Sequence, residues 1–489
     1  MTETMAPPVP APRLVGASDG LSGPDLTGRV LAAARVLRDR GICPGDRVLV
    51  KGDNCVDYVV ALLALMHLDT SLVPVDHRQS AADGRATARQ ARARWLLTDG
   101  TDNTDGTHGT DGIAGPAFPA DRVLRYPGLG ADTAPPPGEV DLTAWLARPD
   151  AVVLWSSGTT GRPKGIVKSG PAVHDNTLRT IQAMGYRADD VLAPLLPFSH
   201  QYGLSVVLLW WLARCTLIVT PYQRLDLAVG QAAAHGVTAV DAAPSTYHSL
   251  LGVVRRRPEL REALAGVRIW GVGGAPLPAP LAEAFPAVMG RPLLDGYGLS
   301  ELGNVALATP DAPTGCGRPL PGVRIRVVTP DGREAAPGEL GEIEVDSPGL
   351  MEGYLLEDGT LTPVRHTTWY PTADLGRFDE AGNLHVVGRN QAVHRLGFTL
   401  YPESLERKAE AAGRQVKVLA VEDSRRGSAL HFVVADPEVA APAEWRRRLA
   451  VHLAEYEQPN AVHVVESFPL SANGKVDARA LRAQVGLGD

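Results

Sequence analysis

Cysteine, basic charge and long apolar runs are all scarce in this chain of 489 residues, and each shortage excludes a class of protein. Four cysteines are present, with no CxxC pair and no histidine at ligand spacing, which excludes a disulfide framework and a zinc site built on cysteines. Lysine and arginine number 48 against 55 acidic residues, a formal net charge of −7, whereas nucleic-acid binding usually calls for a basic domain. We therefore expect no nucleic-acid partner.

Signals for membranes and export are also missing. The most apolar run, Leu204 to Ala213, is far shorter than the roughly 20 residues needed to span a bilayer. The segment from Met1 to Arg13 is rich in proline and alanine and lacks a charged region followed by an apolar one, so we expect no signal peptide. These features predict a soluble, cytoplasmic protein without a membrane partner.

Length and patterning predict more than one domain, of α/β type. A chain of 489 residues exceeds the size at which a single hydrophobic core stops growing. Near the N-terminus, the spacing of apolar residues predicts helices at 26–40 and 57–68 and strands at 45–50 and 70–75. This βαβ rhythm is typical of a layered domain with parallel strands.

The rest of the chain divides by composition. The repetitive stretch 98–112 predicts an exposed, variable connection that extends to about residue 140. Strands and helices alternate again at 152–308, and the glycine- and proline-punctuated stretch 315–353 predicts a small barrel or sheet. Beyond Gly388 the pattern is short and self-contained, with helices expected at 402–412 and 443–453 and strands at 416–421 and 430–434.

The most informative stretch reads VVLWSSGTTGRPKGIV, at 152–167. An apolar run predicts a strand at 152–155, which leads into a loop of small and hydroxylated residues closed by Pro163, Lys164 and Gly165. Small residues let successive backbone N–H groups point into one concavity, as in loops that cradle a polyphosphate. The hydroxyls add donors and Lys164 adds positive charge, so the stretch predicts a phosphate-binding loop.

Two other interpretations of this loop are weaker. A Gly-Thr-Gly cluster alone would indicate a solvated turn, but here hydroxyls and a lysine follow an apolar strand. A Walker A loop needs Gly-Lys-[Ser/Thr] at the start of a helix, whereas Pro163 precedes Lys164 and Gly165 follows it.

The sequence SSGTTGRPKG at 156–165 resembles the phosphate-loop signature of the adenylate-forming superfamily, which includes acyl- and aryl-CoA synthetases, stand-alone adenylation domains and luciferases. The resemblance covers nearly the whole chain from about residue 25. It implies a large N-terminal domain, residues 1–388, of layered α/β/α subdomains plus a small β-barrel. A small, mobile α+β domain, residues 389–489, would follow. The implied activity is ATP-dependent activation of a small carboxylic acid with release of pyrophosphate.

The resemblance also assigns a nucleotide site. Tyr297 would stack on the purine, Ser300 would reach the α-phosphate, and Glu301 would hold Mg²⁺ through oxygen. Asp374 would accept both hydrogen bonds of the ribose diol, with Arg389 as a second contact at the hinge. The predicted nucleotide-binding residues are Ser156, Ser157, Gly158, Thr159, Thr160, Gly161, Lys164, Gly273, Gly274, Ala275, Pro276, Asp295, Gly296, Tyr297, Gly298, Ser300, Asp374 and Arg389.

Two further residues are predicted to be catalytic. His200, in the stretch PFSHQYGL, resembles the histidine that opens the helix lining the acyl pocket, although a lone histidine is more often structural. Lys475 resembles the family's mobile catalytic lysine, and Asn473-Gly474 permits the positive-φ turn that presents it. The predicted acid pocket comprises His200, Gln201, Tyr202, Val272, Gly298, Leu299 and Asn304.

The chain departs from the family pattern in two places. Ala373 replaces the glycine of a Thr-Gly-Asp segment. Between Arg389 and Gly397 the chain is one residue short, Asn390 or Gln391 replaces the acidic hinge residue, and His394 and Thr399 replace basic residues. In the family this segment enters the active site when a thiol attacks the adenylate.

The acceptor of the acyl group therefore has two candidate classes. The first is a thiol, either CoA or the phosphopantetheine of a carrier protein. The second is an amine or another nitrogen nucleophile. A third hypothesis, a catalytically silent ATP-binding scaffold, is disfavoured because Lys475, Glu301 and Asp374 are all present.

Overall fold

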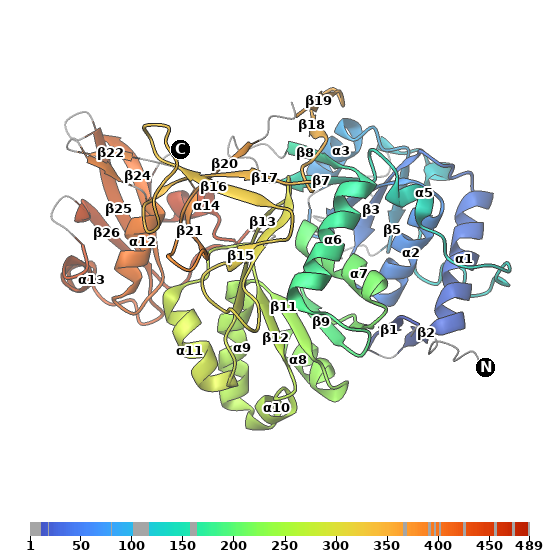
Figure 1. Cartoon of the computed structure of the whole chain (residues 1–489), viewed down its shortest axis with the longest axis horizontal. Coiled ribbons are helices and arrows are strands. Elements are labelled where there is room, and N and C mark those ends of the chain that lie inside the picture. Colours follow the sequence, from blue (N-terminus) through green and yellow to red (C-terminus); the bar gives the residue numbers. More distant parts are fainter. Residues whose placement is uncertain are drawn as a thin grey trace, which may run out of the picture.

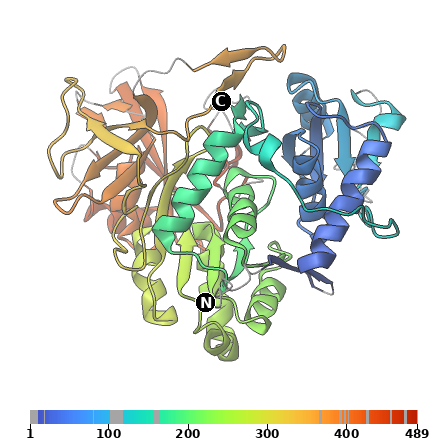
Figure 2. The same cartoon turned by 45° about the vertical axis from the view of Figure 1, so that its right-hand side comes forward.

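The computed structural model describes residues 11–17, 19–79, 81–100, 117–156, 164–364, 369–389, 393–395, 398–400, 402–423, 427–453, 457–471 and 475–487. Two large sheets, of eight and nine strands, form the bulk of the fold, and smaller sheets of four and three strands follow toward the C-terminus. Figures 1 and 2 show the C-terminal part (orange to red) on the side of the molecule opposite the first helices (blue).

The eight-stranded sheet contains the predicted βαβ unit. Its order is β19-β18-β8-β7-β4-β3-β5-β6, and β4, β3, β5 and β6 are mutually parallel neighbours. Helix α2 (Val56–His67) is almost entirely buried between α1 (Gly23–Asp39) and the sheet because its sequence is apolar on every face. The strands are β3 (Arg47–Gly52), β4 (Ser71–Asp76), β5 (Trp95–Thr98), β6 (Val123–Arg125), β7 (Val152–Ser156), β8 (Lys164–Lys168), β18 (Gly353–Leu355) and β19 (Leu361–Pro363).

The nine-stranded sheet has the order β15-β14-β13-β12-β11-β9-β10-β1-β2. Strands β9, β11, β12 and β13 are parallel neighbours, so their carboxyl ends lie at one edge. The strands are β1 (Arg13–Val15), β2 (Gly20–Ser22), β9 (Val191–Leu195), β10 (Thr216–Ile218), β11 (Ala239–Ala242), β12 (Ile269–Val272), β13 (Leu294–Leu299), β14 (Gly303–Leu307) and β15 (Arg318–Pro319).

Helices cover both large sheets. Around the nine-stranded sheet lie α6 (Gly170–Met184), α7 (Gln201–Ala213), α8 (Leu225–Ala234), α9 (Pro244–Arg256), α10 (Pro258–Ala263) and α11 (Ala279–Met289). Helix α3 (Ala81–Gln90) and the short α5 (Thr143–Leu146) belong to the N-terminal part. Among the described residues, no helix combines the length and apolar character needed to cross a membrane. The apolar run at 204–213 is instead part of α7, most of which is buried.

The small barrel or sheet expected at 315–353 is a four-stranded antiparallel sheet in the described residues, and it extends to residue 389. Its order is β16 (Arg324–Val328), β17 (Gly341–Asp346), β20 (Tyr370–Phe378) and β21 (Leu384–Arg389). Its apolar face shares one core with β13 and β14, through residues such as Ile343 and Val305. Just before β15, the backbone at Cys316 and Gly317 exchanges hydrogen bonds with Leu384 of β21, so the four-stranded sheet is joined to the end of the nine-stranded sheet.

The connection expected at 98–140 is more ordered than its composition suggests. Residues 101–116 lie outside the described part of the chain. After them comes a 3₁₀ turn, η1 (Ala120–Arg122), and then β6 pairs with β5. Phe118 and Tyr126 are buried, so part of this segment packs on the fold, whereas most residues from 127 to 140 are exposed, as expected. Composition alone missed the packed part because its few apolar residues stand among many polar ones.

The C-terminal part has its own cores. A three-stranded sheet, β24 (Val416–Asp423), β25 (Gly427–Ala435) and β26 (Ala461–Val465), packs against α12 (Pro402–Glu410) and α13 (Pro442–Ala450) on one face. Helix α14 (Ala478–Gln484) packs on the other face. A short hairpin, β22 (Val393–Arg395) and β23 (Phe398–Leu400), precedes them. The predicted helices and strands of this region are confirmed, whereas a domain boundary at residue 389 stays a prediction.

Candidate active site

The predicted site residues follow the carboxyl ends of neighbouring parallel strands. His200 comes after β9, Gly273 after β12, and Ser300 and Glu301 after β13. Because carboxyl ends of parallel strands meet at one edge, these residues share one side of the nine-stranded sheet. The carboxyl edge of the strands is where ligands bind in open α/β sheets.

The phosphate-loop motif lies between β7 and β8, as predicted. Residues 157–163, with Ser157, Gly158, Thr159, Thr160 and Gly161, lie outside the described residues; Ser156 ends β7 and Lys164 begins β8. The strands pair antiparallel, with Ser156 opposite Lys164, so the chain reverses direction between them. A Cβ at Gly165 would stand 2.9 Å from the Trp155 ring, which explains the glycine after the lysine.

The two glycine-rich turns lie against each other. A Cβ on Gly273 would come within 3.3 Å of the Gly296 carbonyl oxygen and of the Tyr202 ring. Gly274 has φ +80°, a conformation that favours glycine. Ala275 and Pro276 continue this turn, and Gly298 is exposed beside it. The glycine at 273 therefore allows the two turns and Tyr202 to pack closely together.

Asp295 is placed differently from the other predicted nucleotide residues. Its carboxylate accepts a hydrogen bond from the Cys316 thiol, with 3.4 Å between Sγ and Oδ2. Burial raises the pKa of Asp295 to about 7, an effect that the Cys316 hydrogen bond and the positive charge of Arg407, on α12, partly oppose. Asp295 thus connects the nucleotide segment with the C-terminal part.

Tyr297 and Asp374 form a buried pair. The Tyr297 hydroxyl donates a hydrogen bond of 2.7 Å to Oδ2 of Asp374, and each residue is only 7% exposed. The backbone of Asp374 is fixed by the Thr372 hydroxyl, which accepts from the Asp374 N–H at 3.1 Å. Arg389 lies opposite Asp374 in the β20–β21 ladder. An aromatic ring and an oriented carboxylate, the groups predicted for adenine and ribose, are therefore adjacent.

The Thr-Ala-Asp segment contains a backbone irregularity. Ladder pairs of β17 and β20 jump from Glu342–Leu375 to Glu344–Pro371, so three residues of β20 oppose one of β17. Ala373 lies in this bulge with φ +58°. This left-handed conformation favours glycine, the residue that the family resemblance predicts here, and it costs an alanine about 1–2 kcal/mol.

We expect Ala373→Gly to raise the free energy of unfolding by about 0.5–1 kcal/mol. Relief of the strain exceeds the extra flexibility that glycine gives the unfolded chain, which costs about 0.4–1 kcal/mol. Ala373 is exposed, so its methyl group contributes no core packing. Urea unfolding of both proteins measures the difference.

Ala147→Gly is the matched control for this prediction. Ala147 is also exposed, but its φ of −97° suits any residue, so glycine there brings no relief of strain. We expect this variant to lose about 0.4–1 kcal/mol of stability. If both variants were destabilised equally, the strain at Ala373 would be refuted.

Glu301 is held by groups that the sequence did not indicate. Its Oε1 accepts a hydrogen bond of 3.0 Å from the Tyr354 hydroxyl, and its carbonyl oxygen accepts one of 3.3 Å from Nζ of Lys168. Lys168 is fully buried at the end of β8 and also donates to the Gly349 carbonyl. Burial lowers the pKa of Lys168 to about 7, against the opposing effect of Glu301 and Glu352. Lys168 therefore ties the phosphate-loop strand to the Glu301 turn.

Among the described residues, no group of three or more metal-ligating side chains is present. A single carboxylate such as Glu301 still fits Mg²⁺, because this ion keeps several waters and takes its remaining ligands from substrate phosphates.

His200 and Lys475 lie within electrostatic range of each other. His200 is the N-cap residue of α7, and Lys475 lies on the loop between β26 and α14. Burial lowers the pKa of His200 to about 4, the positive charge of Lys475 acts in the same direction, and Asp76 opposes both. His200 is therefore neutral at pH 7. The backbone beside Lys475 is held by a bridge between Leu470 and Val476, and by Asp477, which caps α14.

The predicted acid-pocket residues do not all face one space. Tyr202 lies against Gly271 and Gly273. Leu299 is partly buried at the end of β13, and Val272 belongs to the core of the nine-stranded sheet. Gln201 instead lines a water-sized internal void beside Lys168. Asn304 is bound to α6, where its Nδ2 donates to the Thr180 hydroxyl at 3.0 Å.

Asp241, at the end of β11, is hydrogen-bonded to Tyr202, and the sequence did not predict it as a site residue. Its carboxylate accepts hydrogen bonds from the hydroxyls of Tyr202, at 2.8 Å, and Tyr186, at 3.5 Å. Burial raises the pKa of Asp241 to about 6, although both tyrosines oppose the effect. A charged Asp241 is thus disfavoured in the fold.

We expect Asp241→Asn to gain stability relative to the unmodified protein as pH rises from 4 to 7. Because the folded-state pKa lies above the usual 3.8, the native protein holds an extra proton between these values, and its stability falls until the pH passes about 6. Between pH 4 and pH 7, the free energy of unfolding of Asp241→Asn should rise by roughly 1–3 kcal/mol relative to that of the unmodified protein. Melting temperatures of both proteins across this range measure it. A difference that does not change with pH would contradict the assignment.

Comparisons with known proteins decide the family. The profile described as AMP-binding enzyme matches residues 5–355, more than half of the chain. The chain belongs to the AMP-binding enzyme family. It is an ATP-dependent, AMP-forming acid–thiol ligase, as the motifs at 156–165, 297–301 and 475 predicted.

Similarity to individual AMP-binding enzymes extends over most of the length of the chain. A 3-[(3aS,4S,7aS)-7a-methyl-1,5-dioxo-octahydro-1H-inden-4-yl]propanoyl:CoA ligase of Rhodococcus jostii is 28% identical and covers 96% of each chain. The fatty acid–[acyl-carrier-protein] ligase ScoC of Streptomyces coeruleorubidus is also 28% identical, over 92% of this chain and 88% of its own.

Two crystal structures of one protein, MatB of Rhodopseudomonas palustris, match this fold unequally. Both are 26% identical and cover 97% of this chain, with 96% of the ATP-bound chain and 95% of the apo chain covered. The TM-score is 0.85 for the ATP-bound structure and 0.73 for the apo structure. The chain therefore resembles the ATP-bound form of MatB more closely than the apo form.

Proposed function

We propose that this AMP-binding enzyme binds ATP between the turns at 273–276 and 295–301, with Asp374 on the ribose and Lys475 completing the site from the C-terminal part. The observation that carries the proposal is the nearness of Lys475 to His200, two residues predicted to be catalytic from separate segments. The better match to ATP-bound than to apo MatB supports the same arrangement. Closure of the small domain over the substrates would then gate the reaction.

The first half-reaction joins the acid to the α-phosphate. A carboxylate oxygen attacks the α-phosphorus, the bond to the β-phosphate breaks, and pyrophosphate leaves with its electron pair. Lys475 would neutralise the two anions as they approach, while Lys164 and the loop hydroxyls hold the leaving phosphates. Mg²⁺ held near Glu301 supplies further charge neutralisation when bound. A neutral His200 adds no positive charge that would hold the carboxylate away from phosphorus.

The second half-reaction transfers the acyl group to a thiol. The thiol sulfur attacks the acyl carbon, AMP leaves with the bonding electron pair, and the thiol proton passes to water. Curated relatives include both a CoA ligase and an acyl-carrier-protein ligase. We propose a pantetheine thiol, of CoA or of a carrier protein, as the acceptor.

The function is tested by acid-dependent ATP–pyrophosphate exchange over aromatic, fatty and amino acids, followed by acceptor assays with the best acid. Exchange with at least one acid, and thioester formation with CoA or a phosphopantetheinylated carrier, are the expected results. Rapid amide formation with amines, and no thioester, would overturn the acceptor assignment. Absence of exchange with every acid would overturn the adenylation itself.

A further inference from the structure

One tyrosine contacts both side chains proposed to handle the phosphates and the metal ion. Tyr354 is half-buried on β18, and its hydroxyl donates to Oε1 of Glu301 at 3.0 Å. Its ring lies under Lys164, with 5.4 Å between Nζ and the ring centroid, within the range of a cation–π interaction. The Tyr370 hydroxyl lies 2.9 Å from the Tyr354 hydroxyl. No motif in the sequence indicated either tyrosine.

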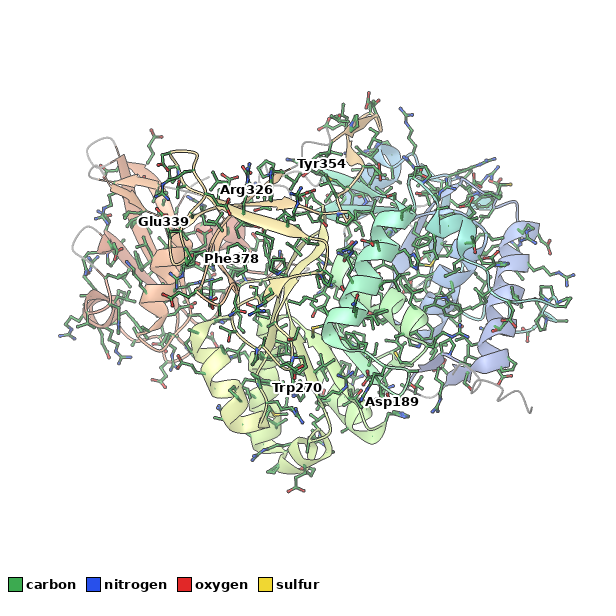
Figure 3. All side chains as sticks on the ribbon, in the orientation of Figure 1. Asp189, Trp270, Arg326, Glu339, Tyr354 and Phe378 are labelled. Atoms are coloured by element: carbon green, nitrogen blue, oxygen red, sulfur yellow. The ribbon has the colours of Figure 1, made fainter. Side chains whose placement is uncertain are left out.

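Tyr354 lies where three sheets meet. Strand β18 belongs to the eight-stranded sheet, Tyr370 begins β20 of the four-stranded sheet, and Glu301 follows β13 of the nine-stranded sheet. Figure 3 shows Tyr354 beside β18, between the four-stranded sheet and the N-terminal part. Tyr354, Tyr370 and Glu301 thus belong to three different sheets, and the Tyr354 hydroxyl is hydrogen-bonded to both of the other residues.

Strand register explains the contact with Lys164. Leu355 pairs with Gly165 and Tyr354 with Ile166, so Lys164 is the diagonal neighbour of Tyr354 on the same face. Diagonal neighbours lie within reach of aromatic and long side chains. Because the Tyr354 proton goes to Glu301, the Tyr370 hydroxyl donates to the Tyr354 oxygen. This relay orients the Glu301 carboxylate before any ligand binds.

We propose that Tyr354 is a positioning residue of the adenylation site, whose hydroxyl orients Glu301 toward Mg²⁺ and whose ring holds Lys164 toward the phosphates. The inference rests on the proposed function, in which Glu301 and Lys164 perform these roles. Preorganised groups bind more tightly because less freedom is lost on binding. The hydroxyl and the ring act on different ligands, so their contributions are separable.

Calorimetric titration of ATP, once with Mg²⁺ and once with EDTA, separates the two contributions without relying on activity. Tyr354→Phe keeps the ring and removes the hydroxyl. We expect it to reduce the gain in ATP affinity that Mg²⁺ provides by about 2–10-fold, the loss of one hydrogen bond, while affinity in EDTA stays unchanged. Tyr354→Leu removes the ring as well, and should also weaken ATP binding in EDTA by about 2–5-fold.

Tyr126→Phe is the matched control, since it removes a tyrosine hydroxyl that donates to the Asp53 carbonyl, at 3.5 Å, in the N-terminal part; we expect its Mg²⁺ gain to stay within about twofold of the unmodified protein. A Tyr354→Phe variant with an unchanged Mg²⁺ gain would overturn the proposal. The proposal would also be overturned if Tyr354→Phe weakened ATP binding equally with Mg²⁺ and with EDTA and lowered the melting temperature, since that result indicates a structural role. Failure of the unmodified enzyme in pyrophosphate exchange would instead overturn the proposed function.

Discussion

Replacement of Lys475 by alanine is expected to lower the rate of acid-dependent ATP–pyrophosphate exchange by about 10²–10³-fold, the usual cost of losing one preorganised charge-stabilising donor. Lys475 is exposed and lies within electrostatic range of His200 at the start of α7. Since the ammonium group acts on charge that develops as the carboxylate meets the α-phosphate, its loss should affect turnover rather than ATP binding. Exchange rates and calorimetric ATP affinities of the variant measure the two effects.

Arg447→Ala is the matched control for this prediction. Arg447 is an exposed cation of the same C-terminal part, on α13, and its removal changes the net charge equally. We expect its exchange rate and ATP affinity to match those of the unmodified enzyme. Undiminished exchange in Lys475→Ala would remove the lysine from the mechanism. Equal losses in both variants would show that net charge, and not position, is responsible.

The Lys475 assignment also predicts a link between His200 and closure. Because Lys475 lowers the pKa of His200, protonation of His200 must weaken the docking of Lys475 by the same free energy. Acid pH would therefore oppose the proposed closure, and neutral pH would favour it. The same linkage explains why a neutral imidazole suits this position.

Local patterns predicted the elements around the site well. Helix α2 was expected at 57–68 and occupies Val56–His67, because twelve residues of nearly continuous apolar character can be buried only between other layers. The motif loops follow strands, as a nucleotide-binding α/β sheet requires. These features depend on residues that are neighbours along the chain, so they can be predicted directly from the sequence.

The residues that support the site could not be predicted in this way. Tyr354 donates to a carboxylate 53 positions away, Tyr202 to one 39 positions away, and Lys168 reaches a carbonyl 133 positions away. Only the packing of elements far apart in the sequence brings these groups together, and no local pattern encodes it. A buried lysine and a buried aspartate also resemble ordinary surface charges in a sequence, because burial is a property of the fold.

The altered hinge segment is known mainly from its sequence, because the structure describes only part of it. Asn390, Gln391 and Gly397 lie outside the described residues, while the backbones of His394 and Thr399 pair in the β22–β23 hairpin. Arg389 is placed opposite Asp374 in the ladder. Under the proposed function, a change of conformation at the hinge would act on this pair, and so link the proposed ribose contact with the proposed domain closure.

Asp374→Ala should raise the ATP concentration needed for half-maximal exchange by about 10–100-fold, because each hydrogen bond to a charged group contributes about 1.5–3 kcal/mol. The carboxylate is buried beside Tyr297, so its loss also leaves the Tyr297 hydroxyl without this acceptor and should lower the free energy of unfolding by about 1–3 kcal/mol. The KM for ATP and urea unfolding measure the two effects separately.

Tyr297→Phe distinguishes binding of the ribose from support of the fold. It removes the hydroxyl that donates to Asp374 and keeps both the aromatic face and the carboxylate. If Asp374 binds the ribose, the KM for ATP should rise far less in Tyr297→Phe than in Asp374→Ala, while both variants lose stability. If the two variants raise the KM equally, Asp374 acts by fixing Tyr297 and not by contacting the ribose. An unchanged KM in Asp374→Ala would place the ribose elsewhere, since no neutral side chain replaces two charge-assisted hydrogen bonds.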